Sequence, residues 1–261
     1  MELYGQVVLG TATMGIHATS RSREADLATI RTGYDLGIRA FDTARVYAPV
    51  GEPLYAEMLL ADALAGLDDV LVMTKGGHFR TPEGGFAVDN SPARLRRDVE
   101  DSLRALRTDQ LTLYLLHRSD DETVPIRESV EELVRLRDEG KIAAIGVSNV
   151  RLDQLLAALE VGPVVAVQNQ YSPLRTTWDP VSRAECAAVL AECERRGIAF
   201  LGYSPLRTDG DPVAVVHPST LGALSPEATV LAEILAASPV MSVITGASRS
   251  ESVRDAVTVL S

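Results

Sequence analysis

Short apolar runs alternate with longer stretches of helical periodicity along the whole chain. The short runs are rich in Val, Ile and Leu and are apolar on both faces, as strands of a parallel sheet covered on both sides must be. The pattern predicts eight strands, at Val7–Leu9, Arg39–Asp42, Val70–Lys75, Leu111–His117, Ile142–Val147, Val164–Gln168, Ala199–Tyr203 and Met241–Ile244.

A helix is predicted after each of these strands. Several helices begin at a capping serine followed by proline, as at Ser91-Pro92 and Ser225-Pro226, and glycines such as Gly140 and Gly197 follow the last turn. The predicted helices are Arg23–Leu36, Pro53–Ala65, Pro92–Leu106, Ile126–Glu139, Leu152–Leu159, Val181–Arg196, Pro226–Ala237 and Ser250–Leu260.

Eight consecutive strand–helix units predict an α/β fold of the (β/α)8 TIM barrel type, formed as a single domain by residues 1–261. A doubly wound sheet would need fewer strands and usually a glycine fingerprint, and neither G-x-G-x-x-G nor G-x-x-x-x-G-K-[ST] occurs. Two long stretches, Gly76–Asn90 and Pro205–Ser225, are predicted as loops. Both follow strands, so they should shape the substrate site on the catalytic face.

The net charge of −11 disfavours a nucleic-acid or anionic membrane surface, because both attract a basic face. There is no signal peptide and no apolar run of membrane-spanning length, so we expect a cytoplasmic protein. Cys186 and Cys193 lie seven residues apart in one predicted helix, too far for a disulfide, and should be free thiols. The four histidines are scattered without ligand spacing, so no metal site is expected.

Catalytic residues of such a barrel come from the carboxyl ends of its strands. Asp42, Lys75 and His117 end the second, third and fourth strands, and Tyr47 follows five residues after Asp42. This set suits carbonyl reduction, in which a tyrosine gives a proton to the carbonyl oxygen. A lysine cation, paired with an aspartate, would bring the high pKa of the tyrosine towards the working range, and a histidine would orient the substrate.

The pattern resembles the aldo-keto reductase superfamily over essentially the whole chain. The motifs that carry the resemblance occur in the family's order, and they are F-D-T-A-R-V-Y, V-M-T-K-G-G, L-Y-L-L-H, E-G-K-I-A-A-I-G-V-S-N, V-A-V-Q-N-Q-Y-S-P-L, L-G-Y-S-P-L and V-I-T-G-A-S-R-S. The resemblance implies a nicotinamide cofactor and makes Tyr47 the proton donor, assisted by Asp42, Lys75 and His117.

The resemblance also implies the cofactor-binding residues. Ser148, Asn149 and Gln168 would bind the nicotinamide carboxamide, and Tyr203 would stack on the ring. The further cofactor contacts it implies are Thr11, Ala12, Asp42, Ser204, Leu206, Gly246, Ser248, Arg249, Ser252 and Asp255. Independently of the family, Arg249 beside a helix N-terminus suits a 2′-phosphate, which favours NADPH while leaving NADH possible.

Four departures from the family pattern affect binding. Ser252 and Ala256 replace longer or amide side chains that often contact adenine, so adenosine binding should be altered. The N-terminal hairpin is expected to be shortened and a C-terminal extension to be lacking, which predicts a more open pocket. Substrate-facing residues are predicted on the loops, with Trp178, Phe79 and His17 as the chosen candidates and His78 and Arg118 as further ones.

Three functions remain open at this point. The first is NADPH-dependent reduction of a small-molecule aldehyde or ketone, or the reverse oxidation of an alcohol. The second is a nicotinamide-binding regulatory or partner-binding subunit without turnover. The third is an aldolase or isomerase in which Lys75 forms a Schiff base, a role that pairing with Asp42 would disfavour.

Overall fold

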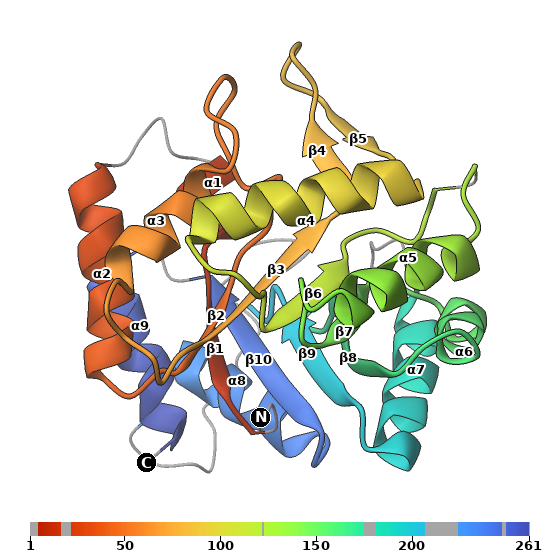
Figure 1. The fold of residues 1–261 in the computed structure, drawn as a ribbon. Helices are drawn as coiled ribbons and strands as arrows, with labels where there is room; N and C mark the ends of the chain where they lie inside the picture. The colour runs from red at the N-terminus through yellow and green to blue at the C-terminus, as the bar shows by residue number, and fades with distance from the viewer. Residues whose placement is uncertain are drawn as a thin grey trace.

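The computed structural model describes residues 5–16, 22–121, 123–174, 181–206, 224–246 and 249–260. Eight parallel strands form a closed barrel, in which each strand pairs with its neighbours and the last pairs with the first (Figure 1). Around the barrel they are β1 (Val7–Gly10), β10 (Met241–Gly246), β9 (Ala199–Tyr203), β8 (Val164–Gln170), β7 (Ile145–Ser148), β6 (Leu113–Leu116), β3 (Leu71–Gly76) and β2 (Ala40–Asp42). The predicted barrel is confirmed.

Helices surround the barrel (Figure 1). Serines cap several of them as predicted, since Ser22, Ser91, Ser182 and Ser225 each accept a hydrogen bond from an amide of the first turn. The helices are α1 (Ala12–Ile16), α2 (Arg23–Asp35), α3 (Tyr55–Ala63), α4 (Pro92–Leu106), α5 (Ile126–Asp138), α6 (Leu152–Leu159), α7 (Arg183–Arg196), α8 (Pro226–Ala236) and α9 (Ser250–Val257), which a 3₁₀ turn follows over Thr258–Leu260.

One predicted loop is partly wrong. The stretch Gly76–Asn90 contains an antiparallel hairpin of β4 (His78–Arg80) and β5 (Phe86–Val88), which projects above α4 in Figure 1. Its tip contains Gly84 and Gly85, and a proline–glycine-rich turn of this kind masks the short alternating strands on either side. The short helix α1 was also not predicted, because five residues give too little periodicity to recognise.

Side chains of alternate strand residues fill the barrel interior. Val8, Ala40, Met73, Ala166 and Leu201 belong to one buried cluster with residues of the other strands. Because side chains alternate between faces, the residue two positions further along each strand also points inward, at the carboxyl end. A ring of inward-facing positions therefore lies above the apolar interior layer, and it contains Gly10 together with the side chains of Asp42, Lys75, Gln168 and Tyr203.

The larger core lies between the outer faces of the strands and the helices. It includes Phe41, Tyr114 and Phe200 from the strands together with Leu59 and Leu133 from the helices. Both cysteines are buried free thiols on α7, as predicted. No helix in the described part of the chain has the length and apolar character needed to cross a membrane.

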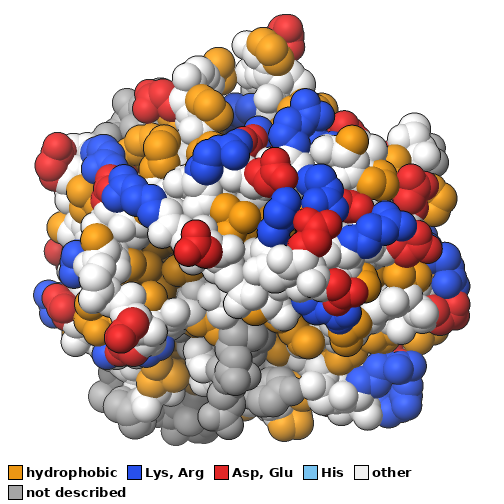
Figure 2. All heavy atoms as spheres, viewed as in Figure 1, with side chains coloured by type: hydrophobic (Ala, Val, Ile, Leu, Met, Phe, Trp, Pro, Cys, Tyr) orange, Lys and Arg blue, Asp and Glu red, His pale blue; other side chains and the backbone are white. Residues whose placement is uncertain are grey.

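Acidic and basic side chains are interspersed on the face seen in Figure 2, over the region of α4 and α5. Arg96 of α4, for example, forms ion pairs with Glu132 and Glu139, and Lys141 pairs with Glu100. The pairs of Arg96 with Glu139 and of Lys141 with Glu100 are partly exposed, and pairs of this kind contribute at most about 1 kcal/mol each. The fold therefore depends on its two apolar clusters more than on this surface network.

Candidate active site

A cavity of about 450 Å³ opens at the carboxyl ends of the strands. Seven of the predicted catalytic or nicotinamide-binding residues border it directly, namely Asp42, Tyr47, His117, Ser148, Asn149, Gln168 and Tyr203. The other residues around it are Gly10, Ala12, Thr13, His78, Arg118, Ser204, Pro205, Leu206, Ile244, Thr245 and Gly246. Side chains that lie far apart in the sequence thus meet in one place, as the barrel predicts.

Lys75 connects the predicted proton donor with its aspartate. Its Nζ donates to Asp42 Oδ2 at 2.8 Å, to the Thr43 carbonyl at 2.8 Å and to the Tyr47 hydroxyl at 3.2 Å. The Lys75 side chain is fully buried, and Asp42 is almost so. Gln168 Nε2 donates to the second carboxylate oxygen of Asp42 at 2.8 Å, which fixes the carboxylate in place. The predicted triad of Asp42, Lys75 and Tyr47 is present with hydrogen-bonding geometry.

The backbone around Tyr47 is held tightly. The Tyr47 amide donates to the Ala44 carbonyl, and its own carbonyl accepts from the Ala56 amide of α3. On the other side, Gly15 of α1 packs so closely that a Cβ there would lie 2.1 Å from the Tyr47 carbonyl oxygen. A side chain at position 15 would therefore displace Tyr47, and glycine is required by close approach.

The ionisation of these groups differs in one respect from the prediction. Burial, with a smaller contribution from Asp42, raises the pKa of Tyr47 well above its usual value, so the expected lowering by Lys75 is not found. Burial lowers the pKa of Lys75, and the Asp42 carboxylate opposes this change. Desolvation disfavours the phenolate more than the neighbouring cation favours it. Tyr47 therefore carries its proton throughout the neutral range, which is the state that a proton donor needs.

His117 stands beside the Tyr47 ring at 5.7 Å between ring centroids, edge to face. Burial, together with the charge of Lys75, lowers the pKa of His117 well below its usual value, so the imidazole is neutral. Its Nδ1 is buried and has no partner among the described residues. A neutral imidazole offers one N–H donor, which fits the predicted role of orienting a carbonyl oxygen.

Ser148, Asn149 and Tyr203 form a hydrogen-bonded group on the opposite wall. Tyr203 donates through its hydroxyl to Asn149 Oδ1 at 2.7 Å, and Asn149 Nδ2 donates to the His117 carbonyl at 2.9 Å and to Ser148 Oγ at 3.1 Å. Ser148 Oγ donates to the Gln168 carbonyl at 2.8 Å. These groups already satisfy one another, so they form a preorganised wall on which a ligand would use the remaining lone pairs and the second amide N–H of Gln168.

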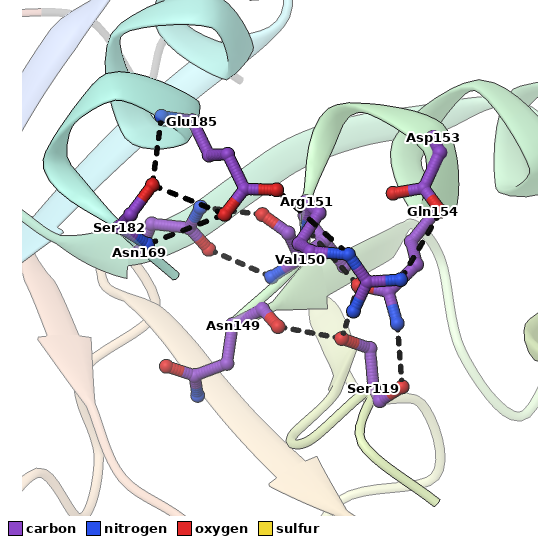
Figure 3. Close-up of polar contacts among 9 residues, drawn as sticks. All are labelled: Ser119, Asn149, Val150, Arg151, Asp153, Gln154, Asn169, Ser182 and Glu185. Atoms are coloured by element: carbon purple, nitrogen blue, oxygen red, sulfur yellow. Dashed lines mark hydrogen bonds and ion pairs between the residues drawn. The ribbon is translucent and has the colours of Figure 1, made fainter. Parts of the chain in front are cut away.

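The backbone at Asn149 is left-handed, with φ of 57°, and two further side chains hold it there (Figure 3). Ser119 donates to the Asn149 carbonyl, and Asn169 brackets the next residue by accepting from the Val150 amide at 3.0 Å and donating to the Val150 carbonyl at 2.8 Å. Neither side chain was predicted as part of the site. Asn169 directly follows the inward-facing Gln168, so its side chain points outward from the barrel. The alternation of side chains along the strand could have predicted this direction.

The comparisons with known proteins agree with this geometry. Residues 6–210 match the model of the Aldo/keto reductase family. The chain belongs to that family. It is 32% identical over 217 residues to an uncharacterized oxidoreductase of Schizosaccharomyces pombe, a match covering 83% of this chain and 62% of the relative. It is 34% identical over 170 residues to the aldo-keto reductase YhdN of Bacillus subtilis, covering 63% of this chain and 50% of the relative. The matched regions thus span between about half and three fifths of these relatives.

Solved structures show the same fold. An aldo/keto reductase from Klebsiella pneumoniae, crystallised with NADP and acetate, aligns with a TM-score of 0.78 and 28% identity, covering 97% of this chain and 85% of that one. The glycerol dehydrogenase AKR11B4 from Gluconobacter oxydans aligns with a TM-score of 0.78 and 26% identity, covering 96% of this chain and 85% of that one. The barrel of this aldo-keto reductase is therefore that of its family.

The remaining predicted cofactor residues separate into two groups. Ala12, Ser204, Leu206 and Gly246 border the cavity, whereas Thr11 is fully buried and donates its hydroxyl to the Asp42 carbonyl, so Thr11 supports the cavity from behind. The adjacent Thr13, which was not predicted, borders the cavity instead.

The predicted adenosine contacts lie beyond the cavity. Arg249 is the exposed residue that precedes α9, and it forms no ion pair with any described residue. Asp255 accepts a hydrogen bond from Ser225 at 2.7 Å and so contributes to the start of α8, while Ser252 is half-buried on α9. The adenosine contacts of these three residues stay predictions, and Ser248 lies outside the described residues.

Of the predicted substrate residues, Phe79 does not border the cavity as described. Its ring lies under the Arg94 guanidinium at 3.7 Å, on the outer side of the hairpin, and the neighbouring His78 borders the cavity instead. Successive strand residues face opposite sides, so of the two neighbouring candidates only His78 borders the cavity, as does the further candidate Arg118. His17 and Trp178 lie outside the described residues. Among the described residues, no group of three or more His, Cys, Asp or Glu could hold a metal ion.

Replacing Asn169 with aspartate should weaken both the fold and the wall formed by Ser148, Asn149 and Tyr203. The carboxylate would face the Val150 carbonyl with no proton to donate, and an unsatisfied buried polar group costs about 1–3 kcal/mol. We expect a loss of about that size in the free energy of unfolding and weaker nicotinamide binding, measured by denaturant titration and cofactor fluorescence. Gln110→Glu makes the same amide-to-carboxylate change at an exposed position, where water can replace the lost hydrogen bond to the Gly140 carbonyl, so it should lower the free energy of unfolding much less and leave cofactor binding unchanged. Unchanged stability of Asn169→Asp would contradict the bracketing role.

Proposed function

We propose that this aldo-keto reductase reduces an aldehyde or ketone with NADPH, and that Tyr47 supplies the proton to the carbonyl oxygen. The observation that carries the proposal is the contact of Lys75 with both Asp42 and the Tyr47 hydroxyl at the cavity wall, at 2.8 Å and 3.2 Å. When bound, the nicotinamide supplies the hydride that the carbonyl carbon needs. The protein supplies the proton, the orientation and the electrostatic environment.

The cavity fits such a cofactor. The Thr13 hydroxyl is buried, borders the cavity and has no partner among the described residues, so it is a polar group that a ligand would satisfy. The half-buried ring of Tyr203 borders the same space and offers a flat surface for stacking. Ser148, Asn149 and Gln168 would bind the carboxamide beside it. The Klebsiella pneumoniae relative was crystallised with NADP, which supports the choice of cofactor.

The proton transfer follows from the charges at the site. Tyr47 is protonated at neutral pH, and its proton passes to the carbonyl oxygen as negative charge develops there. The phenolate that remains lies 3.2 Å from the Lys75 ammonium, which stabilises it more strongly than water would because the site is buried. Asp42 keeps Lys75 charged, and the neutral His117 donates a hydrogen bond that holds the carbonyl oxygen near Tyr47. The same steps in reverse oxidise an alcohol.

The choice of NADPH over NADH rests on Arg249. Its guanidinium is exposed at the start of α9 and unpaired within the described part of the chain, so it is available for a 2′-phosphate. Lys75 is not available for a Schiff base, because it is paired with Asp42 at 2.8 Å. This pairing removes the support for the aldolase interpretation.

The experiment that tests the function measures NADPH and NADH consumption over a panel of aldehydes, ketones and sugars, beside direct binding of each cofactor. We expect turnover with NADPH on at least one carbonyl compound and weaker binding of NADH. The absence of both turnover and cofactor binding would overturn the proposal. Binding of NADPH without any turnover would instead support the regulatory, nicotinamide-binding function.

A further inference from the structure

A second polar cluster lies on the outer side of β3, behind the cavity. Its centre is Asp98 of α4, whose side chain is fully buried. Asp98 Oδ1 lies 2.8 Å from Arg45 Nε and 2.8 Å from Arg94 Nε, and Oδ2 accepts the Gly77 amide proton at 3.0 Å. One carboxylate thus contacts two separate segments of the chain, through Arg45 and Gly77, besides Arg94 of its own helix.

The first of these segments carries Tyr47. Arg45 lies two residues before Tyr47 in the connection from β2 to α3, and its amide donates to the Lys75 carbonyl at 3.2 Å. Its side chain is fixed on α4 at two points, by the ion pair with Asp98 and by a hydrogen bond from Nη2 to Asp101 Oδ2 at 2.9 Å. The position of the Tyr47 segment relative to Lys75 therefore depends on α4.

The second segment carries His78. Gly77 has a φ of +81° and connects the end of β3 with the hairpin, and its amide is the one that Asp98 binds. His78 follows directly, with its ring 4.9 Å from the ring of His117 at the cavity wall. A Cβ at position 77 would lie 2.3 Å from Asn90 Oδ1, so this turn has little freedom to adjust.

We propose that Asp98 is a positioning residue for the reduction, because it fixes the segments of Tyr47 and His78 to one helix and so sets the space between the proton donor and the opposite wall. The inference rests on the proposed function. Asp98 does not border the cavity, so it acts only through Arg45 and Gly77. A displacement of about 1 Å at a reacting group can lower a rate about 100-fold, so fixing the two segments with Asp98 should maintain the rate of reduction.

The test compares Asp98→Asn with Glu132→Gln. The two carboxylates are closely matched, since the Glu132 side chain is 5% exposed on α5 and pairs with Arg96 and Arg135. Neither of those arginines belongs to a segment that carries a residue of the cavity. Both variants lose one charge of a buried ion-pair network, so both should lose stability. Only the Asp98 variant should affect the site.

Three measurements distinguish a positioning role of Asp98 from a purely structural one, and all are made well below the unfolding temperature. We expect Asp98→Asn to lower kcat about 10- to 100-fold, with the dissociation constant for NADPH changed less than about twofold. Hydrogen exchange should accelerate in peptides covering residues 43–48 and 77–88. Glu132→Gln should leave kcat and both exchange rates unchanged. Equal kcat for the two variants, after correction for the folded fraction, would overturn the inference.

A second variant serves if Asp98→Asn does not fold. Arg45→Lys keeps the charge but loses the fork that reaches Asp98 and Asp101 together, so it should lower kcat and accelerate exchange in residues 43–48. Unchanged kcat and exchange in this variant would equally contradict the inference. If the unmodified protein reduces no carbonyl compound, the proposed function fails, and the exchange rates alone decide whether Asp98 holds the two segments.

Discussion

Replacing Tyr47 with phenylalanine should lower kcat for carbonyl reduction by about 100- to 10,000-fold, the usual contribution of a positioned general acid. The variant loses only the hydroxyl that contacts Lys75 Nζ. The ring stays beside His117, so the cavity keeps its shape, and NADPH should bind with nearly unchanged affinity. Steady-state kinetics and cofactor fluorescence measure the two effects separately.

The matched control is Tyr55→Phe. Tyr55 is a half-buried tyrosine at the start of α3 that does not border the cavity. Its loss of a hydroxyl should leave kcat unchanged. A Tyr47→Phe variant as active as its parent would exclude Tyr47 as the donor.

Because the pKa of Tyr47 lies well above its usual value, the unmodified enzyme should also show no loss of reductase rate between about pH 6 and pH 9 from ionisation of this tyrosine.

Much of the site could be predicted because the carboxyl ends of all strands of a barrel lie close together at one rim. Asp42, Lys75 and Gln168 lie far apart in the chain, yet each lies at or near the carboxyl end of a strand on its inward face, and they share hydrogen bonds in the structure. The alternation of side chains decides inward or outward direction without any knowledge of the loops. That is why the predicted catalytic set and the wall of Ser148, Asn149 and Tyr203 lie around one cavity.

The rest depends on contacts between elements, which no local pattern records. Arg45 looks like a surface residue in the sequence, and its pairing with Asp98 becomes visible only when α4 is placed against the connection after β2. The hairpin at Gly76–Asn90 was missed for a related reason, since its two three-residue strands are stabilised mainly by each other. The pKa of Tyr47 was predicted in the wrong direction because the sequence gives the neighbouring charge but not the depth of burial.

The contribution of Glu57 to folding stability should fall as pH rises from about 4.5 to 7, while the lowered pKa values of His78 and His117 act in the opposite direction. Glu57 of α3 is fully buried, and its Oε1 accepts a hydrogen bond from the Thr74 hydroxyl at 2.6 Å. Burial raises the pKa of Glu57 to about 7, although Thr74 and Arg45 oppose the change and Asp98 adds to it.

The direction follows from proton binding. Between pH 4.5 and 7 the unfolded chain has lost the Glu57 proton while the folded protein retains it, so each unit of pH favours unfolding by about 1.4 kcal/mol, or about 3 kcal/mol over this interval. Above pH 7 the folded protein loses the proton too, and the difference stays constant. The full stability contribution is therefore present only below about pH 4.5.

Glu57→Gln isolates this effect, because the amide keeps an acceptor for Thr74 and cannot ionise. Denaturant unfolding at pH 5 and pH 8 should show the variant gaining about 2–3 kcal/mol relative to its parent between the two values. Glu131→Gln removes a half-exposed carboxylate of α5 and should show no comparable gain. A constant difference between Glu57→Gln and its parent would mean that the carboxyl is already ionised at pH 5. In that case Arg45 and Thr74 stabilise its charge more than burial opposes it.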